Sequence, residues 1–181
     1  MARLSAQALY DSATALQAGD VKAAIAVRNR EPREDTGALA QPIESQLGFI
    51  LQRTPKLLAD CPPKILEPLR IAAAMMILWG TSNIREFVTI EGESTYRFVP
   101  EAIALILFTH GCILHRLEEM RGLGITRVQL VGSGLEEDCE ACRAANGAIF
   151  NIDDVPELPL VNCRCKTGYG CGVGVVPVEP D

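Results

Sequence analysis

The chain has 181 residues and a net charge of −6, with 48% hydrophobic but only 5% aromatic residues. This length predicts one domain, or one domain with an appendage, that buries a core without covalent help. The acidic balance argues against a general electrostatic affinity for nucleic acid or for anionic membranes. The apolar stretches 71–80 and 102–114 are too short to cross a bilayer, and the N-terminus lacks a secretory core, so we expect cytosolic synthesis and no membrane partner.

Helices dominate the predicted structure, because Ala, Leu, Ile and Val supply most of the apolar residues. Gly19 and Asp20 form a helix stop followed by an N-cap, and Pro42 and Pro100 occupy the favoured first-turn position of a helix. Pro68 is expected to begin or kink an apolar helix that lies in the middle of the fold, and Gly80 is expected to end that helix. The expected helices cover residues 3–17, 21–28, 42–53, 69–79 and 100–121.

Strands are expected in three places. Residues 87–99 carry two β-branched and aromatic runs on either side of a turn, which is typical of a β-hairpin. Residues 126–131 form a short predicted strand, and residues 148–152 can form another after the Asn146-Gly147 turn signal. The glycine- and proline-rich end of the chain has too little periodicity for a regular element and is expected to be an extended arm or a loop.

These elements predict a mainly α fold, a helical bundle with a β-hairpin and a small C-terminal α+β cysteine-knuckle module of the zinc-ribbon kind. The expected boundaries place the helical domain at residues 1–122, with the hairpin near 87–99. The cysteine-knuckle module follows at residues 123–166, and an extended C-terminal tail covers residues 167–181.

Four of the seven cysteines form two closely spaced pairs, Cys139 with Cys142 and Cys163 with Cys165. Two such pairs separated by a hairpin-sized spacer can supply the tetrahedral four-sulfur site that zinc prefers. Disulfides between the pairs, or four free thiols, are the alternatives, and Cys171 could replace one member of the C-x-C pair. A closed zinc site of this kind would stabilise the fold and leave no open position for chemistry.

No pattern typical of catalysis accompanies the cysteines. The sequence contains no Walker phosphate loop and no evident Ser/His/Asp or Cys/His arrangement. His110 falls on an apolar helical stripe, and His115 lies five residues away on a different face, so we expect His110 to be a buried, hydrogen-bonded imidazole and not a ligand. A redox-active C-x-x-C is disfavoured because neither a helix N-terminus nor a parallel sheet, the setting that lowers a thiol pKa, is expected there. We therefore expect a non-enzymatic protein.

An acidic run surrounds the first cysteine pair. Seven acidic residues and one basic residue lie between Gly132 and Pro159. The simplest interpretation of this run is a solvated loop face, and the alternative is a patch for a basic partner surface. Calcium binding is disfavoured because no loop in this run has the spacing of calcium ligands.

Residues 124–165 combine a strand entry, an acidic residue before C-x-x-C, a turn glycine, a proline-spaced loop and a C-R-C ending. The residues of this pattern are Gly124, Ile125, Val128, Asp138, Cys139, Cys142, Gly147, Pro156, Pro159, Asn162, Cys163, Arg164 and Cys165. This segment resembles the C-terminal end of the MuF-type phage head-morphogenesis proteins, a family of minor head proteins. The His-Pro that usually precedes the final Asn in that family is replaced here by Leu160-Val161, which removes a candidate metal ligand.

The resemblance implies a phage or prophage structural protein that acts in head morphogenesis or in the head–neck region. The implied partners are portal or major capsid protein subunits, together with further copies of the chain, and direct sequence-specific binding of nucleic acid is not implied. The implied location is the bacterial cytoplasm during assembly and the virion afterwards. A bacterial intracellular zinc-knuckle adaptor is the competing class, and a thiol-based enzyme is a third.

Overall fold

The computed structural model describes residues 6–30, 43–80, 96–134, 136, 138–165 and 174–178 of the chain. Its first part, the helical body, contains α1 (Ala6–Gln17), α2 (Val21–Arg30), α3 (Ile43–Gln52), a 3₁₀ turn (Lys56–Leu58), α4 (Pro63–Trp79) and α5 (Pro100–Gly122). Its second part, the cysteine module, contains β1 (Arg127–Val131), α6 (Glu140–Ala145), β2 (Ile149–Asn151), a 3₁₀ turn (Ile152–Asp154) and β3 (Gly174–Pro177). The described residues are mainly helical with a small antiparallel sheet and a cysteine cluster, so the predicted fold class is confirmed.

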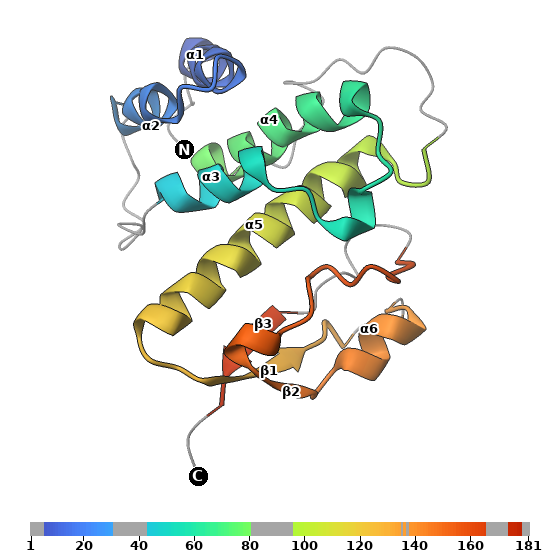
Figure 1. Cartoon of the computed structure of the whole chain (residues 1–181). Helices are drawn as coiled ribbons and strands as arrows, with labels where there is room; N and C mark the ends of the chain where they lie inside the picture. Colours follow the sequence, from blue (N-terminus) through green and yellow to red (C-terminus); the bar gives the residue numbers. More distant parts are fainter. Residues whose placement is uncertain are drawn as a thin grey trace.

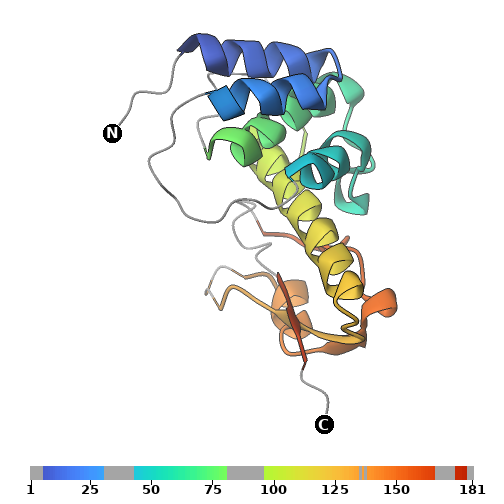
Figure 2. The ribbon, with the colours of Figure 1, turned by 90° about the vertical axis from the view of Figure 1, so that its left-hand side faces the viewer.

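Helix α5 runs from the helical body to the cysteine module (Figure 1). It packs against α3 and α4 within the helical body, and it also contacts β3 of the module. A view turned by 90° shows the same arrangement, with the helices on one side of the molecule and the sheet at the far end of α5 (Figure 2). The two parts of the protein therefore share one continuous helix as their connection.

Close packing of α3 against α5 forms the centre of the helical body. Leu47 and Ile50 of α3 and Ile103 of α5 are buried there. A Cβ atom added to Gly111 of α5 would lie 2.5 Å from Ile50 Cγ1 and 3.4 Å from the backbone oxygen of Gln46. The glycine therefore permits a helix approach that any side chain would obstruct, and burial of the aliphatic side chains drives the association.

The turn between α1 and α2 follows the predicted cap chemistry. Gly19 has a φ of 75°, a left-handed conformation that glycine adopts without steric cost. The backbone N–H of Ala23 donates to Asp20 Oδ1 at 2.9 Å, so Asp20 caps the first turn of α2. The predicted stop and N-cap are both confirmed.

The start of α4 differs from the prediction. The helix begins at Pro63, before the expected start at residue 69, and Pro68 lies inside it. Pro63 occupies the first turn, where its missing N–H would have no helical partner, whereas Pro68 removes one donor from the helix interior. The apolar residues of the helix remain buried along its length, which offsets that loss. Gly80, with a φ of 66°, ends the helix as expected and donates its N–H to the carbonyl of Met76.

Arg70 is a charged residue of α4 that is buried against α3. Its Nη1 donates to the backbone oxygens of Ile50 and Arg53, each at 2.7 Å, and its Nη2 donates to Thr54 Oγ1. Carbonyl oxygens at the end of a helix lack intrahelical partners. The guanidinium of Arg70 therefore satisfies the C-terminal end of α3 and ties that end to α4.

The only tryptophan of the sequence, Trp79, is the last residue of α4 and is buried in the helical body. The guanidinium of Arg28 on α2 lies 4.9 Å from the centroid of its ring. Arg28 Nε also donates to the backbone oxygen of Leu78 at 2.7 Å. The cation–π contact and this hydrogen bond join α2 to the C-terminal end of α4.

The sheet has the strand order β2-β1-β3, and both pairings are antiparallel. Val128 of β1 lies opposite Phe150 of β2, while Leu130 lies opposite Val175 of β3. The predicted strands at 126–131 and 148–152 are confirmed. Part of the expected C-terminal arm, Gly174–Pro177, is a paired strand, because the buried side chain of Val175 anchors it to the face of β1 that carries Val128 and Leu130.

The expected β-hairpin cannot be compared along its whole length, because residues 87–95 lie outside the described part of the chain. Residues 96–98, which follow them, form bends. Phe98 is buried, and Tyr96 donates its hydroxyl to Asp60 Oδ1 at 2.7 Å. Burial and this hydrogen bond raise the pKa of Tyr96 to about 12. The end of this segment is therefore fixed to the helical body through its aromatic side chains.

Candidate metal centre

The two cysteine pairs lie in different local structures, but their sulfur atoms form one cluster. Cys139 directly precedes α6, and Cys142 lies in the first turn of that helix. The second pair follows a tight turn in which the N–H of Cys163 donates to the carbonyl of Leu160 at 2.9 Å. Cys165 then completes the cluster, and the four Sγ atoms all lie within 4.8 Å of one another. The structure thus brings together all four residues that the sequence singled out.

The sulfur spacing matches a tetrahedral metal site. Cys139 Sγ lies 3.6 Å from Cys142 Sγ and 4.0 Å from Cys163 Sγ. Cys142 Sγ lies 3.7 Å from Cys163 Sγ and 3.9 Å from Cys165 Sγ. A tetrahedron with Zn–S bonds of 2.3 Å has sulfur–sulfur edges of about 3.8 Å, whereas a disulfide bond is about 2.05 Å long. No disulfide therefore joins these four cysteines, and their geometry fits a metal ion.

Burial makes negative charge costly on most of these thiols. Cys142, Cys163 and Cys165 are buried and Cys139 is half-buried. Burial, together with the charge on Cys163, raises the pKa of the Cys142 thiol well above its ordinary value, and burial raises the pKa of Cys165 to about 11. A divalent cation would remove this cost by neutralising the thiolates, so metal binding and deprotonation are coupled at this site.

Backbone N–H groups also point at the cluster. Arg164 N–H donates to Cys139 Sγ at 3.3 Å, and Cys139 N–H donates to Cys165 Sγ at 3.4 Å. Burial acts to raise the pKa of Cys139, but the Arg164 N–H and the hydrogen bonds from the neighbouring cysteines outweigh it, so the pKa lies below its ordinary value. Such N–H···S contacts orient metal ligands and spread their charge. They indicate that the backbone is already arranged around the sulfur atoms.

Helix α6 was not expected from the sequence. It is six residues long and has Cys139 at its N-cap position. The expectation that no helix begins at the C-x-x-C was wrong, because the Ala-rich residues after Glu140 form a helix of under two turns, which is too short to show periodicity in the sequence. The other part of a redox-active setting, a parallel sheet, is not found among the described strands, which pair antiparallel.

The Asn146-Gly147 turn is hydrogen-bonded to the central strand β1 and to the residue that follows it. Gly147 has a φ of 84°, and its N–H donates to the carbonyl of Leu130 at 2.8 Å. Asn146 Oδ1 accepts from the N–H of Gly132, also at 2.8 Å. The predicted turn is thus confirmed, and it returns the chain from α6 into β2 next to the central strand.

The loop between the two cysteine pairs contacts the helical body. His110 Nδ1 lies 2.5 Å from the backbone oxygen of Leu158, and both residues are buried. Arg121 on α5 bonds to Asp153 Oδ1 at 2.9 Å, and the backbone N–H of Lys56 donates to Glu157. His110 is therefore the buried, hydrogen-bonded imidazole predicted from the sequence, and its partner is the loop that connects the ligand pairs.

The structure reveals a Ser–His–Glu arrangement that the sequence did not. Ser45 Oγ on α3 lies 2.6 Å from His115 Nδ1, and His115 Nε2 lies 3.4 Å from Glu119 Oε1. His115 is also buried, although its position suggested a face away from the apolar stripe. The pocket lined by Glu119 does not include Ser45. We interpret the contact between Ser45 and His115 as a structural hydrogen bond that joins α3 to α5.

Three carboxylates of the acidic run have hydrogen-bond partners within the protein. Asp138 is buried and accepts from Ser133 Oγ at 2.7 Å. Asp153 pairs with Arg121 as described above, and Asp154 Oδ2 accepts from Asn151 Nδ2 at 3.0 Å. These carboxylates hold turns of the cysteine module in place, so we assign no ion or partner to them.

Comparison of the chain with protein-family models, curated proteins and solved structures gives no match. The similarity to the MuF-type family therefore stays a prediction from the motif residues. Among the described helices, none combines the length and the apolar character that a membrane crossing requires. What the geometry defines is a protein with a four-cysteine site that could hold a metal ion.

Proposed function

We propose that the cluster of Cys139, Cys142, Cys163 and Cys165 binds one structural zinc ion. The observation that carries this proposal is the cluster of four sulfur atoms, in which four of the Sγ–Sγ distances lie between 3.6 and 4.0 Å and all lie within 4.8 Å. Four thiolates complete a tetrahedral zinc site and leave no open position for water or substrate. Iron could occupy the same tetrahedral sulfur set, so the identity of the metal is part of the experiment.

Metal analysis of protein purified without added zinc tests this first proposal. We expect about one zinc ion per chain, with four thiols that become titratable only after denaturation in the presence of a chelator. Protein without metal, in which four of the seven thiols remain untitratable after denaturation, would indicate disulfides and contradict the zinc site. A red, iron-containing preparation would retain the cluster as a metal site but replace the metal.

We further propose that the protein is a non-enzymatic structural component of phage or prophage head morphogenesis. Its support is the MuF-type motif, from the acidic residue before Cys139 to the C-R-C ending. The ending supplies two of the four clustered thiols, although the family's His-Pro is replaced by Leu160-Val161. A closed structural metal site suits such a protein, because it stabilises the fold of a binding surface without taking part in a reaction. The proposed partners are portal or major capsid subunits, and assembly takes place in the bacterial cytoplasm before incorporation into the virion.

The genes beside this one provide the first test of the phage proposal. We expect neighbouring genes for terminase, portal and capsid proteins, and co-purification of the chain with the neighbouring portal or capsid protein when the two are expressed together. A monomeric protein encoded among housekeeping genes would instead favour an intracellular zinc-knuckle adaptor. Both classes use the metal centre in the same way, so only the partner and the genome neighbourhood separate them.

A further inference from the structure

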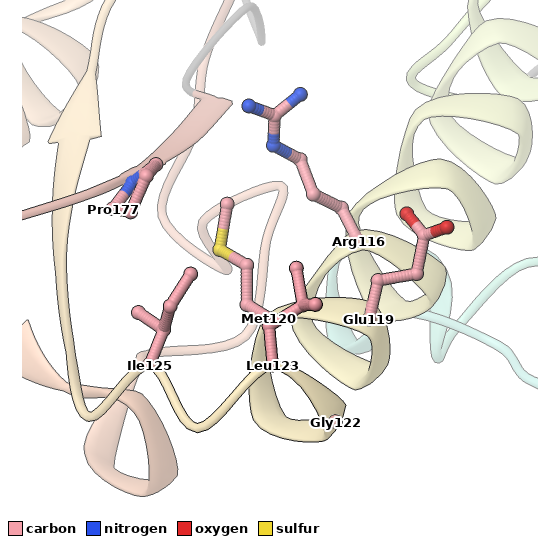
Figure 3. Close-up of a pocket in the computed structure, with 7 residues that line it drawn as sticks. All are labelled: Arg116, Glu119, Met120, Gly122, Leu123, Ile125 and Pro177. Carbon is pink, nitrogen blue, oxygen red and sulfur yellow. The ribbon is translucent and has the colours of Figure 1, made fainter.

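An apolar pocket of about 480 Å³ lies where the end of α5 meets the sheet (Figure 3). This volume falls in the range of roughly 300–1,000 Å³ that is typical of ligand sites. The pocket is separate from the sulfur cluster, since none of the four cysteines lines it. The side chains that carry the inference are Arg116, Glu119, Met120, Leu123, Ile125 and Pro177.

The floor and one wall of this pocket are apolar. Met120 is buried at the base, Ile125 and Pro177 face it from the strand side, and Leu123 stands at the rim (Figure 3). Leu123 is 79% exposed, which is unusual for a leucine beside an apolar pocket. Covering these side chains with another apolar group would remove their surface from water, so the pocket favours an apolar occupant.

Arg116 adds a positive charge to this apolar surface. Its guanidinium projects toward the space between Pro177 and Glu119, while the carboxylate of Glu119 points another way (Figure 3). Glu119 lies 3.4 Å from His115 Nε2, and the guanidinium of Arg116 has no ion pair or hydrogen bond with another residue in the described part of the chain. An exposed guanidinium of this kind binds a carboxylate through two parallel hydrogen bonds.

We propose that the pocket receives a large aliphatic or aromatic side chain of a partner protein, and that a neighbouring carboxylate of the same partner segment pairs with Arg116. The proposal rests on the proposed function as an interaction protein and names the chemistry of the partner segment. Arginine is enriched among the residues that carry most of the binding energy in protein interfaces, and those residues cluster in well-packed pockets from which water is excluded. A membrane occupant does not fit, because the chain carries a net charge of −6.

Selection from a library of short random peptides, displayed against the zinc-loaded full-length protein, tests this proposal. We expect the selected peptides to combine Leu, Ile, Phe or Trp with an adjacent Asp or Glu. Fluorescence polarisation with one selected peptide should show roughly tenfold weaker binding to Leu123→Ser and to Arg116→Gln. Arg53→Gln and Val161→Ser replace an exposed arginine and an exposed apolar residue outside the pocket, and they should bind the peptide unchanged.

A second measurement isolates the charge contact. Replacing the acidic residue of the peptide by its amide should weaken binding to the unsubstituted protein about tenfold and have no further effect on Arg116→Gln, because the same contact is lost in both cases. Additive losses would overturn the assigned pair. Peptides without an acidic residue, or full binding to Leu123→Ser, would overturn the pocket. Self-association that Leu123→Ser abolishes would replace the partner segment by a second copy of the chain.

The zinc content of each variant separates this proposal from the proposed function. Arg116→Gln and Leu123→Ser change no sulfur ligand and should retain about one zinc ion per chain. Failure of peptide selection by fully zinc-loaded protein would overturn the pocket and leave the metal centre intact. Selection of acidic–apolar peptides by protein that binds no zinc would support the pocket and contradict the structural zinc.

Discussion

The helical body and the cysteine module are stabilised by different means. The helical body has an extensive aliphatic core in which α3, α4 and α5 pack closely and residues such as Leu47, Leu69 and Ile103 are fully buried. Among its described residues the cysteine module has only a few buried apolar side chains, and three of its four clustered cysteines take core positions. A small domain with so little apolar burial usually needs a staple such as a metal ion. The comparison predicts that changes to the cysteines and to the helix packing will affect different parts of the molecule.

Loss of one cysteine ligand is expected to have the largest effect. Cys142→Ser should abolish stoichiometric zinc and unfold the cysteine module, because structural zinc contributes on the order of 10 kcal/mol to the folding of such modules. Limited proteolysis and circular dichroism should show cleavage after residue 122 with the helical body retained. Cys112→Ser, a matched change outside the cluster on α5, should retain both zinc and protease resistance. Equal melting curves for the two variants would contradict the role of the cluster.

The second largest effect is expected when the close contact between α3 and α5 at Gly111 is obstructed. This change should destabilise the helical body. Gly111→Ala places a Cβ atom against Ile50, and overpacking of a well-packed core costs roughly 1–3 kcal/mol. Urea denaturation followed by circular dichroism measures this loss, while the zinc content should not change. Gly122→Ala serves as the control, because a Cβ there meets no atom within 4 Å. A Gly111→Ala protein as stable as the control would show that α3 and α5 separate easily.

Loss of the His110 side chain is expected to weaken the contact between the helical body and the cysteine module. His110→Ala leaves the buried backbone oxygen of Leu158 without its partner, which costs about 1–3 kcal/mol. Hydrogen exchange should become faster in the loop between the two cysteine pairs and remain slow in α3 and α4. Faster exchange throughout the helical body would instead identify His110 as part of the main core.

The smallest expected effect is the loss of a helix cap. Asp20→Ala removes the acceptor for the Ala23 N–H and should lower the free energy of unfolding by about 1 kcal/mol. Asp11→Ala, within the preceding helix and far from any cap, should have a smaller effect. Thermal denaturation of the two variants side by side measures the difference, and a larger loss for Asp11→Ala would contradict the capping role of Asp20.

Local signals in the sequence predicted much of the fold. The cap at Asp20, the stop at Gly80 and the turn at Asn146-Gly147 were all found, because each depends on the chemistry of a few adjacent residues. Helix α6 and strand β3 were missed for the opposite reason. Six residues are too few to show helical periodicity, and β3 is a strand only because Val175 packs against the central strand.

The members of the candidate site could be predicted from the sequence, but most of its contacts could not. The spacing of the cysteines identified all four members of the cluster, since closely spaced cysteine pairs are a property of the local sequence. The N–H···S contacts of Cys139 and the bond between Ser45 and His115 could not be predicted, because they join residues that are distant in the chain. The pocket beside Leu123 likewise exists only where α5 and β3 meet.

Trp79 and the cysteine cluster can give the two regions separate spectroscopic signals. This only tryptophan lies in the helical body next to Arg28, so its fluorescence reports on the packing of α2 and α4. Cobalt bound by four thiolates would absorb visible light and report on the cysteine module alone. Two probes recorded in one denaturation experiment would therefore reveal whether the regions unfold together or in sequence, and coincident transitions would mean that α5 transmits stability from one region to the other.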